Sequence, residues 1–194
     1  MTSPDYNIDM LVEIPNNSFV KYEFDKDDKF IRVDRVLHTC MAYPGNYGYI
    51  EKTLAEDGDP IDVLLIADYK LHPLSKIRIR LVGVLLMTDE KGKDEKLLAV
   101  PHESVDPTYH EIHDITDVPK HYLKKIKHFF EHYKDTEPNK FVNVEDFADK
   151  DVAMKLYDAS VERHKEASSV LYRAAKIHSK LPEPKYSMAD WCDN

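Results

Sequence analysis

The stretch Asp57-Gly58-Asp59-Pro60-Ile61-Asp62-Val63 organises this chain of 194 residues, because it places three carboxylates within one short segment. Gly58 permits a tight bend, and Pro60 is unfavourable inside a central strand, so we expect the first half to be a turn. The apolar run that follows (IDVLLIA, residues 61–67) is typical of a buried strand, which would hold the turn rigidly. A turn here can gather all three carboxylates around one point.

Carboxylates gathered in this way need cations. Two of them at a separation of about 4 Å repel each other by roughly 4 kcal/mol in a medium of intermediate dielectric constant. Hard oxygen ligands favour Mg²⁺, Mn²⁺ or Ca²⁺ over zinc. An isolated Asp-Gly-Asp is more often an acidic surface turn, but Asp62 at the start of an apolar strand favours a divalent-metal site.

The composition is that of a globular protein, with 42% hydrophobic and 32% charged residues. The net charge of −9 opposes nucleic-acid binding, which depends on a cationic surface. No apolar run approaches the length of a membrane-spanning helix, and residues 1–20 contain no signal-peptide core, so we expect no membrane partner. Cys40 and Cys192 lie far apart, and we interpret both as free thiols of a cytoplasmic protein.

Three strands are predicted before the acidic turn, over residues 8–14, 19–24 and 30–37. Lys21 and Glu23 share one face of the second strand, and ordinary polar-out alternation would explain them. In the third strand Arg35 falls on the same face as Ile31 and Val33, where an unpaired guanidinium would be costly. Such an arginine is usually paired or functional.

Residues 41–50 (MAYPGNYGYI) are predicted to be a loop, because Pro, Gly and Asn are concentrated there. Tyr43, Tyr47 and Tyr49 are interleaved with these turn-forming residues. A tyrosine can pack in a core or offer its phenol to an anion, and this segment permits either use.

Residues 76–87 form a long predicted strand that alternates until Gly83 and is apolar afterwards, so Gly83 predicts a bulge or a tight barrel bend. A charged loop follows, and residues 97–101 begin another strand. The resulting hairpin would bring Asp89 and Asp94 close together, although a charged hairpin tip is usually only solvated. Five or six antiparallel strands with such a bend predict an α+β fold, mainly β, built on a small closed barrel.

Two helices complete the chain. The first is predicted from Val118, with Asp117 as its N-cap and Pro119 in its first turn. His128 and His132 lie four residues apart on one face, a spacing compatible with zinc, but no third ligand is apparent and a surface or subunit-contact role is favoured.

The second helix is predicted over residues 151–180, with an apolar stripe formed by Val170, Leu171, Ala174, Ile177 and Leu181. We expect that stripe to pack on the body or on a neighbour. Residues 185–194, which include Trp191, are predicted to be a dispensable tail. We expect one domain over residues 1–165 and a C-terminal helical extension and tail over residues 166–194.

With these segments placed, the sequence resembles the family I (soluble) inorganic pyrophosphatases of the shorter bacterial type. DGDPIDV matches that family's signature throughout. The likeness continues, in order, through EIP (13–15), KYEFD (21–25), DR (34–35), YPGNYGYI (43–50), MTDEKGKDEK (87–96), AVPH (99–102) and HFFEHYKD (128–135). It covers residues 8–160 and says nothing about the C-terminal extension.

The resemblance implies an OB-like five-stranded barrel with flanking helices and an active site at the barrel mouth. The implied metal ligands are Asp57, Asp62, Asp94, Asp89 and Glu23. The implied phosphate-binding and catalytic residues are Lys21, Arg35, Tyr47, Tyr133 and Lys134. Asp59 would accept the proton of the attacking water, with Glu13, Tyr43, Glu90 and Lys96 in the surrounding shell.

The implied activity is hydrolysis of pyrophosphate to two orthophosphates with several Mg²⁺ ions, for which Mn²⁺ or Zn²⁺ could substitute and which Ca²⁺ would inhibit. The resemblance also implies a homo-oligomer, with a hexamer favoured. Two alternatives stay open on the residues alone. One is an OB-type nucleic-acid binder, which the acidic charge disfavours, and the other is a divalent-metal-binding OB-type module without catalysis, which leaves Lys21, Arg35 and Lys134 without a task.

Overall fold

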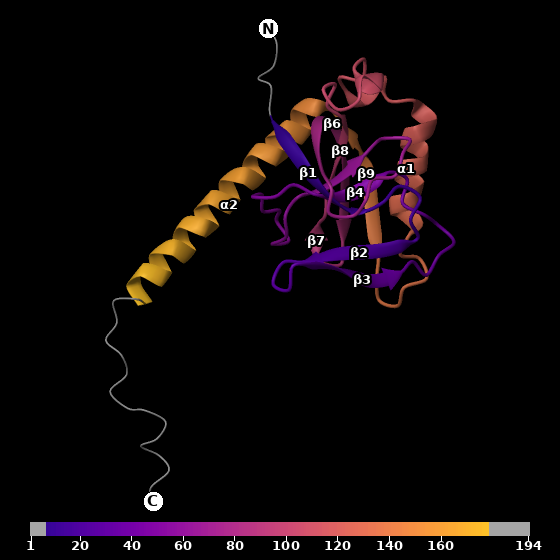
Figure 1. Ribbon diagram of the computed structural model, residues 1–194. Coiled ribbons are helices and arrows are strands. Elements are labelled where there is room, and N and C mark those ends of the chain that lie inside the picture. The colour runs from indigo at the N-terminus through magenta and orange to yellow at the C-terminus, as the bar shows by residue number, and fades with distance from the viewer. Residues whose placement is uncertain (1–6, 179–194) are drawn as a thin grey trace, which may run out of the picture.

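The computed structural model describes residues 7–178, with side chains described for residues 7–170 (Figure 1). Its strands are β1 (Ile8–Ile14), β2 (Val20–Asp25), β3 (Phe30–Val36), β4 (Asn46–Tyr49), β5 (Asp62–Leu65), β6 (Lys76–Asp89), β7 (Gly92–Lys93), β8 (Lys96–Pro101) and β9 (Val142–Ala148). Its helices are α1 (Lys120–His132) and α2 (Lys150–His178), with short 3-10 turns at η1 (Pro107–Tyr109) and η2 (Ile115–Asp117).

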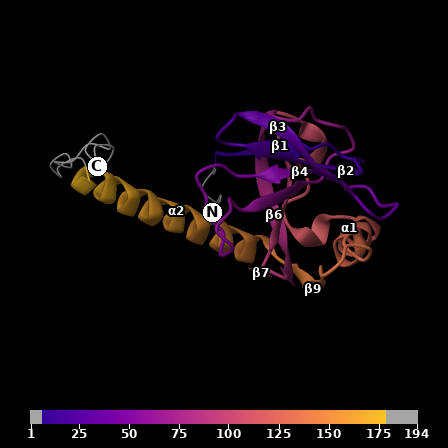
Figure 2. The ribbon, with the colours of Figure 1, turned by 90° about the horizontal axis from the view of Figure 1, so that it is seen from below.

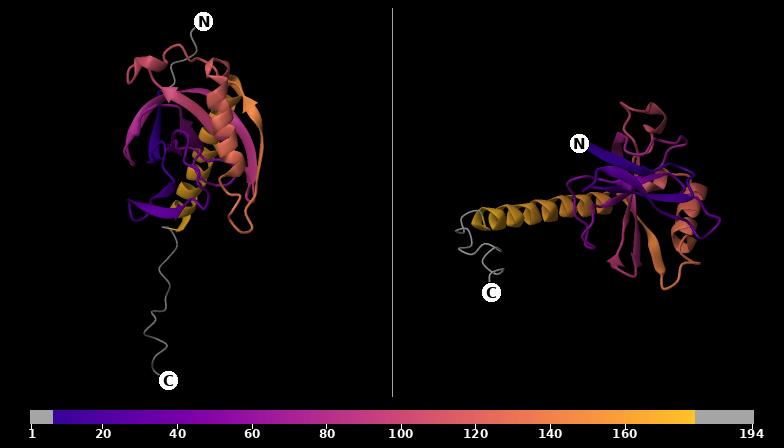
Figure 3. Two further views of the ribbon diagram at one scale, coloured as in Figure 1. Left: turned by 90° about the vertical axis from the view of Figure 1, so that its right-hand side faces the viewer. Right: turned by 60° about the horizontal axis from the view of Figure 1, so that its bottom comes forward.

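Five strands pair in a ring. The main sheet runs β1-β4-β5-β8-β6, and β6 pairs again with β1 to close it. The curved main sheet is visible in Figure 3, where α1 and β9 lie on one side of it. β2 and β3 form a separate two-stranded hairpin below the ring (Figure 1). The predicted mainly β, OB-like fold with a five-stranded barrel is confirmed. One pairing differs from the expected antiparallel pattern, because β5 and β8 run parallel.

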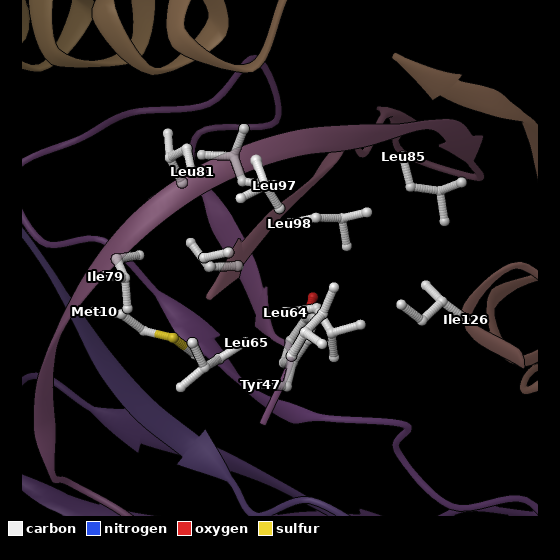
Figure 4. Close-up of a cluster of buried hydrophobic side chains, with 14 of the residues drawn as sticks. Met10, Tyr47, Leu64, Leu65, Ile79, Leu81, Leu85, Leu97, Leu98 and Ile126 are labelled. Atoms are coloured by element: carbon white, nitrogen blue, oxygen red, sulfur yellow. The ribbon is translucent and has the colours of Figure 1, made fainter. Parts of the chain in front are cut away.

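The barrel is filled by side chains from all of its walls. Figure 4 shows Leu64 and Leu65 of β5 surrounded by Met10, Ile79, Leu97 and Leu98 from neighbouring strands, and all six are fully buried. Full burial of one such side chain contributes roughly 1.5–3 kcal/mol. β5 is therefore held from both faces, and the turn before it starts from a rigid support.

Gly83 marks a bulge, as predicted: the pairing of β6 with β8 shifts register between Leu81 and Gly83. A Cβ atom at Gly83 would lie 2.8 Å from the carbonyl oxygen of Ala148 and 2.9 Å from Cβ of Ile115. The absence of a side chain therefore lets β9 and η2 approach β6 closely at this point.

The predicted loop over residues 41–50 is wrong in its second half, since Asn46–Tyr49 is strand β4. A Cβ atom at Gly48 would lie only 1.9 Å from the carbonyl oxygen of Leu11. Gly48 is thus required by the close approach of β1 rather than by a turn, and sequence patterns do not separate these two uses of glycine. Strand β9 was also not predicted.

The predicted N-cap of the first helix is wrong as well. Asp117 belongs to η2, where it completes a capping box with Asp114, and α1 begins at Lys120 after Pro119. Val118 between them is extended (φ −74°, ψ 132°), as expected for a residue before proline. Pro119 therefore separates the 3-10 turn from the helix.

Helix α2 begins one residue before the predicted start and runs past the barrel. Ala153 and Ser160 are fully buried in its first part. Its C-terminal part extends away from the barrel in Figure 2. Val170, the first member of the predicted stripe, is 63% exposed and does not pack on the body. The side chains of the other stripe members and the tail 185–194 lie outside the described residues.

Neither of the two helices in the described part of the chain is long and apolar enough to cross a membrane. Cys40 is an exposed free thiol, whereas Cys192 lies outside the described residues.

Candidate active site

A cleft of about 340 Å³ opens between the barrel, the β2–β3 hairpin and the segment that follows α1. Every site residue named from the sequence lines it. These residues are Glu13, Lys21, Glu23, Arg35, Tyr43, Tyr47, Asp57, Asp59, Asp62, Asp89, Glu90, Asp94, Lys96, Tyr133 and Lys134. They come from positions 13 to 134 of the chain, and the barrel topology brings them together.

The acidic side of the cleft is built on the turn before β5. Gly58 adopts φ +94°, a conformation that favours glycine, and Asp59 N–H donates to Asp57 Oδ1 at 3.0 Å. Asp57 and Asp59 are exposed, while Asp62 at the first position of β5 is partly buried. The turn therefore presents three carboxylates at graded depths along one wall.

Lys96 neutralises the buried end of this wall. Its Nζ donates to Asp62 Oδ2 at 2.6 Å and also to Asp94, while only 3% of the lysine side chain is exposed. Burial by itself would lower the pKa of Lys96, but the two carboxylates raise it. The pKa of Asp94 is raised, because burial and the charge of Asp62 outweigh the effect of Lys96. Two carboxylates share one internal cation here.

Glu13 lies on β1 at the base of the same wall. Burial, reinforced by the charges of Asp62 and Glu23, raises its pKa to about 7. Its Oε1 accepts a hydrogen bond from Phe24 N at 2.6 Å. Glu13 thus ties the β2–β3 hairpin to the barrel.

The hairpin wall carries Lys21 and Arg35. Lys21 Nζ bonds Glu23 and lies 3.6 Å from Asp34 Oδ2. Arg35 donates to Asp34 at 2.7 Å and to Glu137 at 3.0 Å. Arg35 is therefore paired, as the sequence indicated, although its expected apolar face is largely open to solvent, with Val33 62% exposed.

A second cationic wall follows α1. Lys134 Nζ donates to Asp89 Oδ2 at 2.8 Å and to Glu90 Oε2 at 3.3 Å. Lys140 adds a contact of 2.9 Å to Glu90. Partial burial disfavours the charged form of Glu90, but Lys134 and Lys140 lower the pKa of this carboxyl to about 2. The hairpin acids are therefore held by lysines rather than left as a solvated tip.

Three tyrosines form the floor. Tyr43, Tyr47 and Tyr133 are buried, and burial raises the pKa of each well above its usual value. Their rings pack with Phe129 and Phe130 of α1, including a stacked pair of Tyr133 and Phe129 at 5.1 Å. Neutral phenols in this position can donate hydrogen bonds to an anion while their rings belong to the core.

The donor set fits hard divalent cations. Five aspartates line one cleft, and two of them, Asp62 and Asp94, share the ammonium group of Lys96 as their cation. Among the described residues no group of three or more His, Cys, Asp or Glu side chains is placed to hold a metal ion as it stands, and lysines bond four of the cleft carboxylates instead. His128 and His132 have ring centroids 4.7 Å apart and do not line the cleft.

Several residues of the site were missed in the sequence. Glu137 is buried and holds Arg35, and the cations Lys26, Lys91 and Lys140 line the cleft. The only signal for Glu137 is an acid shortly after the Tyr133-Lys134 pair, in a segment without periodicity. Its partner lies 102 residues away in the sequence, so no local pattern reveals the contact.

Comparison with known proteins agrees with this geometry. The family model described as inorganic pyrophosphatase matches residues 10–165. A protein named inorganic pyrophosphatase from Sulfolobus acidocaldarius is 52% identical over 142 residues, which is 73% of this chain and 82% of that protein. Its namesake from Campylobacter jejuni is 48% identical over 158 residues, covering 81% of this chain and 92% of that protein.

Solved structures give the same result. The chain superposes on an inorganic pyrophosphatase from Helicobacter pylori with a TM-score of 0.81 and 45% identity, covering 85% of this chain and 98% of that one. An inorganic pyrophosphatase from Thermus thermophilus gives a TM-score of 0.80 and 42% identity, with 84% and 95% coverage. From residue 10 to residue 165, this chain belongs to the inorganic pyrophosphatase family.

Proposed function

We propose that this protein hydrolyses inorganic pyrophosphate to two orthophosphates, in a reaction that depends on divalent metal ions, with Mg²⁺ as the preferred one. The observation that carries the proposal is the single cleft in which five aspartates face Lys21, Arg35 and Lys134. Pyrophosphate is small, highly charged and almost without apolar surface, so a site for it must be ionic. The cleft contains acids for metals and cations for phosphates.

The metal ligands in this proposal are Asp57, Asp62, Asp89, Asp94 and Glu23. When bound, the metals neutralise phosphate oxygens and lower the pKa of the attacking water. Lys96 holds Asp62 and Asp94 in place, Glu90 holds Lys134, Glu13 ties the β2–β3 hairpin to the barrel, and Tyr43 supports the floor beside Tyr47. Mn²⁺ or Zn²⁺ could substitute for Mg²⁺ at these ligands.

The protein's own groups bind and orient the substrate. Lys21, Arg35 and Lys134 hold phosphate oxygens, and the phenols of Tyr47 and Tyr133 donate hydrogen bonds to them. Asp59 accepts the proton of the attacking water while the water oxygen forms a bond to one phosphorus. The bridging P–O bond breaks, and the cations stabilise the charge on the leaving phosphate.

The magnitudes explain why so many charged groups are needed. Enzymes lower activation barriers by about 8–23 kcal/mol, whereas one general base supplies roughly 10²–10⁴-fold in rate. Positioning and charge neutralisation must supply the rest. A non-catalytic metal-binding module would leave the paired cations of two walls without a function.

The testing experiment measures orthophosphate release from pyrophosphate with Mg²⁺, with and without excess chelator. We expect release that stops with chelator and falls when Ca²⁺ is added, since the looser coordination of Ca²⁺ disturbs the geometry. Undiminished release in chelator would contradict metal dependence. Mg²⁺ binding without any release would support the non-catalytic module instead.

We also propose a cytoplasmic homo-oligomer, with a hexamer favoured. Its support is the family membership together with exposed apolar side chains on the β2–β3 hairpin and directly before it, where Phe19, Val33 and Val36 are 59, 62 and 51% exposed. The exposed His128 and His132 on α1 would lie at a subunit contact.

A further inference from the structure

Helix α2 holds the loop that carries the acidic turn. The backbone N–H of Leu54 donates to the carbonyl oxygen of Ser160 at 2.9 Å. The carbonyl oxygen of Leu54 accepts a hydrogen bond from Arg163 Nε at 2.8 Å. Both backbone polar groups of one loop residue are therefore bonded by a single turn of α2, which itself packs on the barrel through Ala153 and Ser160.

The contact continues into the turn through the backbone. Ala55 N–H, next in the chain, donates to the carbonyl oxygen of Asp59 at 2.7 Å, and Gly58 N–H donates to the carbonyl oxygen of Ala55 at 3.3 Å. The segment from Ala55 to Asp59 is thus closed by hydrogen bonds within itself. The position of this segment therefore depends on how Leu54, the residue directly before it, is held.

A second anchor lies on the opposite side of the loop. Thr53 Oγ1 donates to the carbonyl oxygen of Ile50 at 2.5 Å and accepts from Ile61 N at 3.0 Å. This anchor keeps the ends of the loop together, so loss of the α2 contact would free the tip without unfolding its base. The Thr53 anchor therefore closes the loop, whereas the α2 anchor fixes the position of its tip.

The hydrogen bond of Arg163 is not a by-product of an ion pair. Within the part of the chain that the structure describes, no carboxylate lies within ion-pair distance of Arg163. Arg163 is partly buried, and its guanidinium donates to a neutral carbonyl oxygen. A charged donor makes a stronger hydrogen bond than a neutral one, which suits a contact that must hold a backbone in place.

We propose that Arg163 is a positioning residue for divalent-metal binding, acting through Leu54 on the turn that carries Asp57 and Asp59. This inference rests on the proposed function of the cleft. It assigns to α2 a role in the site, although none of the described side chains of α2, over residues 150–170, lines the cleft. Loss of the contact should weaken Mg²⁺ binding more than it lowers the rate at saturating Mg²⁺.

Two substitutions separate the hydrogen bond from the charge. In Arg163→Gln the amide nitrogen occupies the place of Nε along the side chain, so the donor is kept and the charge is lost. In Arg163→Met a methyl group occupies that place, so both are lost. Lys165→Met removes an exposed cation of the same helix, whose Nζ bonds Glu162 at 3.2 Å, and serves as the control.

The first measurement is Mg²⁺ binding by calorimetry, together with the Mg²⁺ concentration that gives half-maximal phosphate release. We expect Arg163→Met to raise the dissociation constant for Mg²⁺ and the half-maximal Mg²⁺ concentration by about 3- to 10-fold each, while turnover at saturating Mg²⁺ changes by less than about twofold. Arg163→Gln and Lys165→Met should behave like the unmodified protein. Equal effects of Met and Gln, or no effect of Met, would overturn the proposal.

The second measurement does not depend on activity. Hydrogen exchange of the metal-free protein should be faster for the amides of Ala55 and Gly58 in Arg163→Met than in Arg163→Gln. Unchanged exchange would overturn the proposed positioning. If the unmodified protein released no phosphate at any Mg²⁺ concentration, the proposed function would fail, whereas Mg²⁺ binding and exchange would still decide the role of Arg163.

Discussion

Arg35 Nε donates to Glu137 Oε1 at 3.0 Å across 102 residues of sequence, and only 6% of the Glu137 side chain is exposed. The contact joins the β2–β3 hairpin to the segment that follows α1. It fixes the direction of a guanidinium that we propose to hold phosphate. A carboxylate as buried as that of Glu137 needs a cationic partner, and Arg35 is that partner.

We expect Glu137→Gln to raise the KM for pyrophosphate several-fold with a smaller change in kcat, because Arg35 loses one of its two charged partners but stays in the cleft through Asp34. The free energy of unfolding should fall by about 1–3 kcal/mol. Steady-state kinetics and urea denaturation measure the two effects. Glu145→Gln, on the exposed side of β9, is the matched control and should alter neither. Unchanged KM in Glu137→Gln would contradict the positioning of Arg35.

Lys96→Met tests the internal cation between Asp62 and Asp94. Without metal, the variant should lose about 3–5 kcal/mol of stability, because two close carboxylates are left without a cation. Mg²⁺ should bind more tightly than in the unmodified protein, since it no longer competes with the ammonium group. Thermal unfolding as a function of Mg²⁺ concentration measures both. Lys70→Met, an exposed lysine outside the cleft, should show neither change, and weaker Mg²⁺ binding by Lys96→Met would refute this account.

Asp59 and Asp62 should respond differently to the same substitution. Asp62→Asn should raise the Mg²⁺ requirement sharply and lower the maximal rate, since a neutral amide cannot offset metal charge. Asp59→Asn should bind metal and substrate comparatively well but lose about 10²–10⁴-fold in turnover. That loss should shrink as the pH rises, because more of the water is already deprotonated. A pH–rate profile at saturating Mg²⁺ checks both variants, and near-normal turnover of Asp59→Asn at neutral pH would mean that another group takes the proton.

Gly48→Ala tests the packing of β4 against β1. The added Cβ would lie 1.9 Å from the carbonyl oxygen of Leu11, a contact that only a shift of backbone can relieve. We expect the free energy of unfolding to fall by about 1–3 kcal/mol or more. Denaturant unfolding in the presence of chelator measures it without the contribution of bound metal. An unchanged midpoint would mean that the two strands separate without cost.

The oligomeric state is measured by light scattering at neutral to mildly alkaline pH over a range of concentrations. We expect the mass of a hexamer, because the exposed Phe19, Val33 and Val36 are better covered by another copy than by water. Substitution of Val36 by Asp should shift the mass downward if this hairpin lies at a contact. A monomer at all concentrations would contradict the assembly.

Local chemistry determined much of this protein. Gly58 and Pro60, close together in the sequence, predict the acidic turn, and the apolar run after them predicts β5. The alternation of apolar and polar residues predicts the strands that contain Lys21 and Gly83. Each of these predictions depends on residues close together in the sequence, because turn preferences and the two-residue period of strands are properties of neighbouring residues. The family motifs then extend these signals to the set of residues that the structure brings into one cleft.

Contacts between distant segments were decided by the tertiary structure alone. From the sequence, Gly48 is predicted to be a loop residue and Asp117 a helix cap. In the structure Gly48 lies against Leu11, and Pro119 separates Asp117 from α1. The partners of Glu137 and Arg163 are set by how the hairpin and α2 meet the barrel. Such contacts depend on packing between elements, for which neighbouring residues carry no periodic signal, and so only the folded chain reveals what holds the site in place.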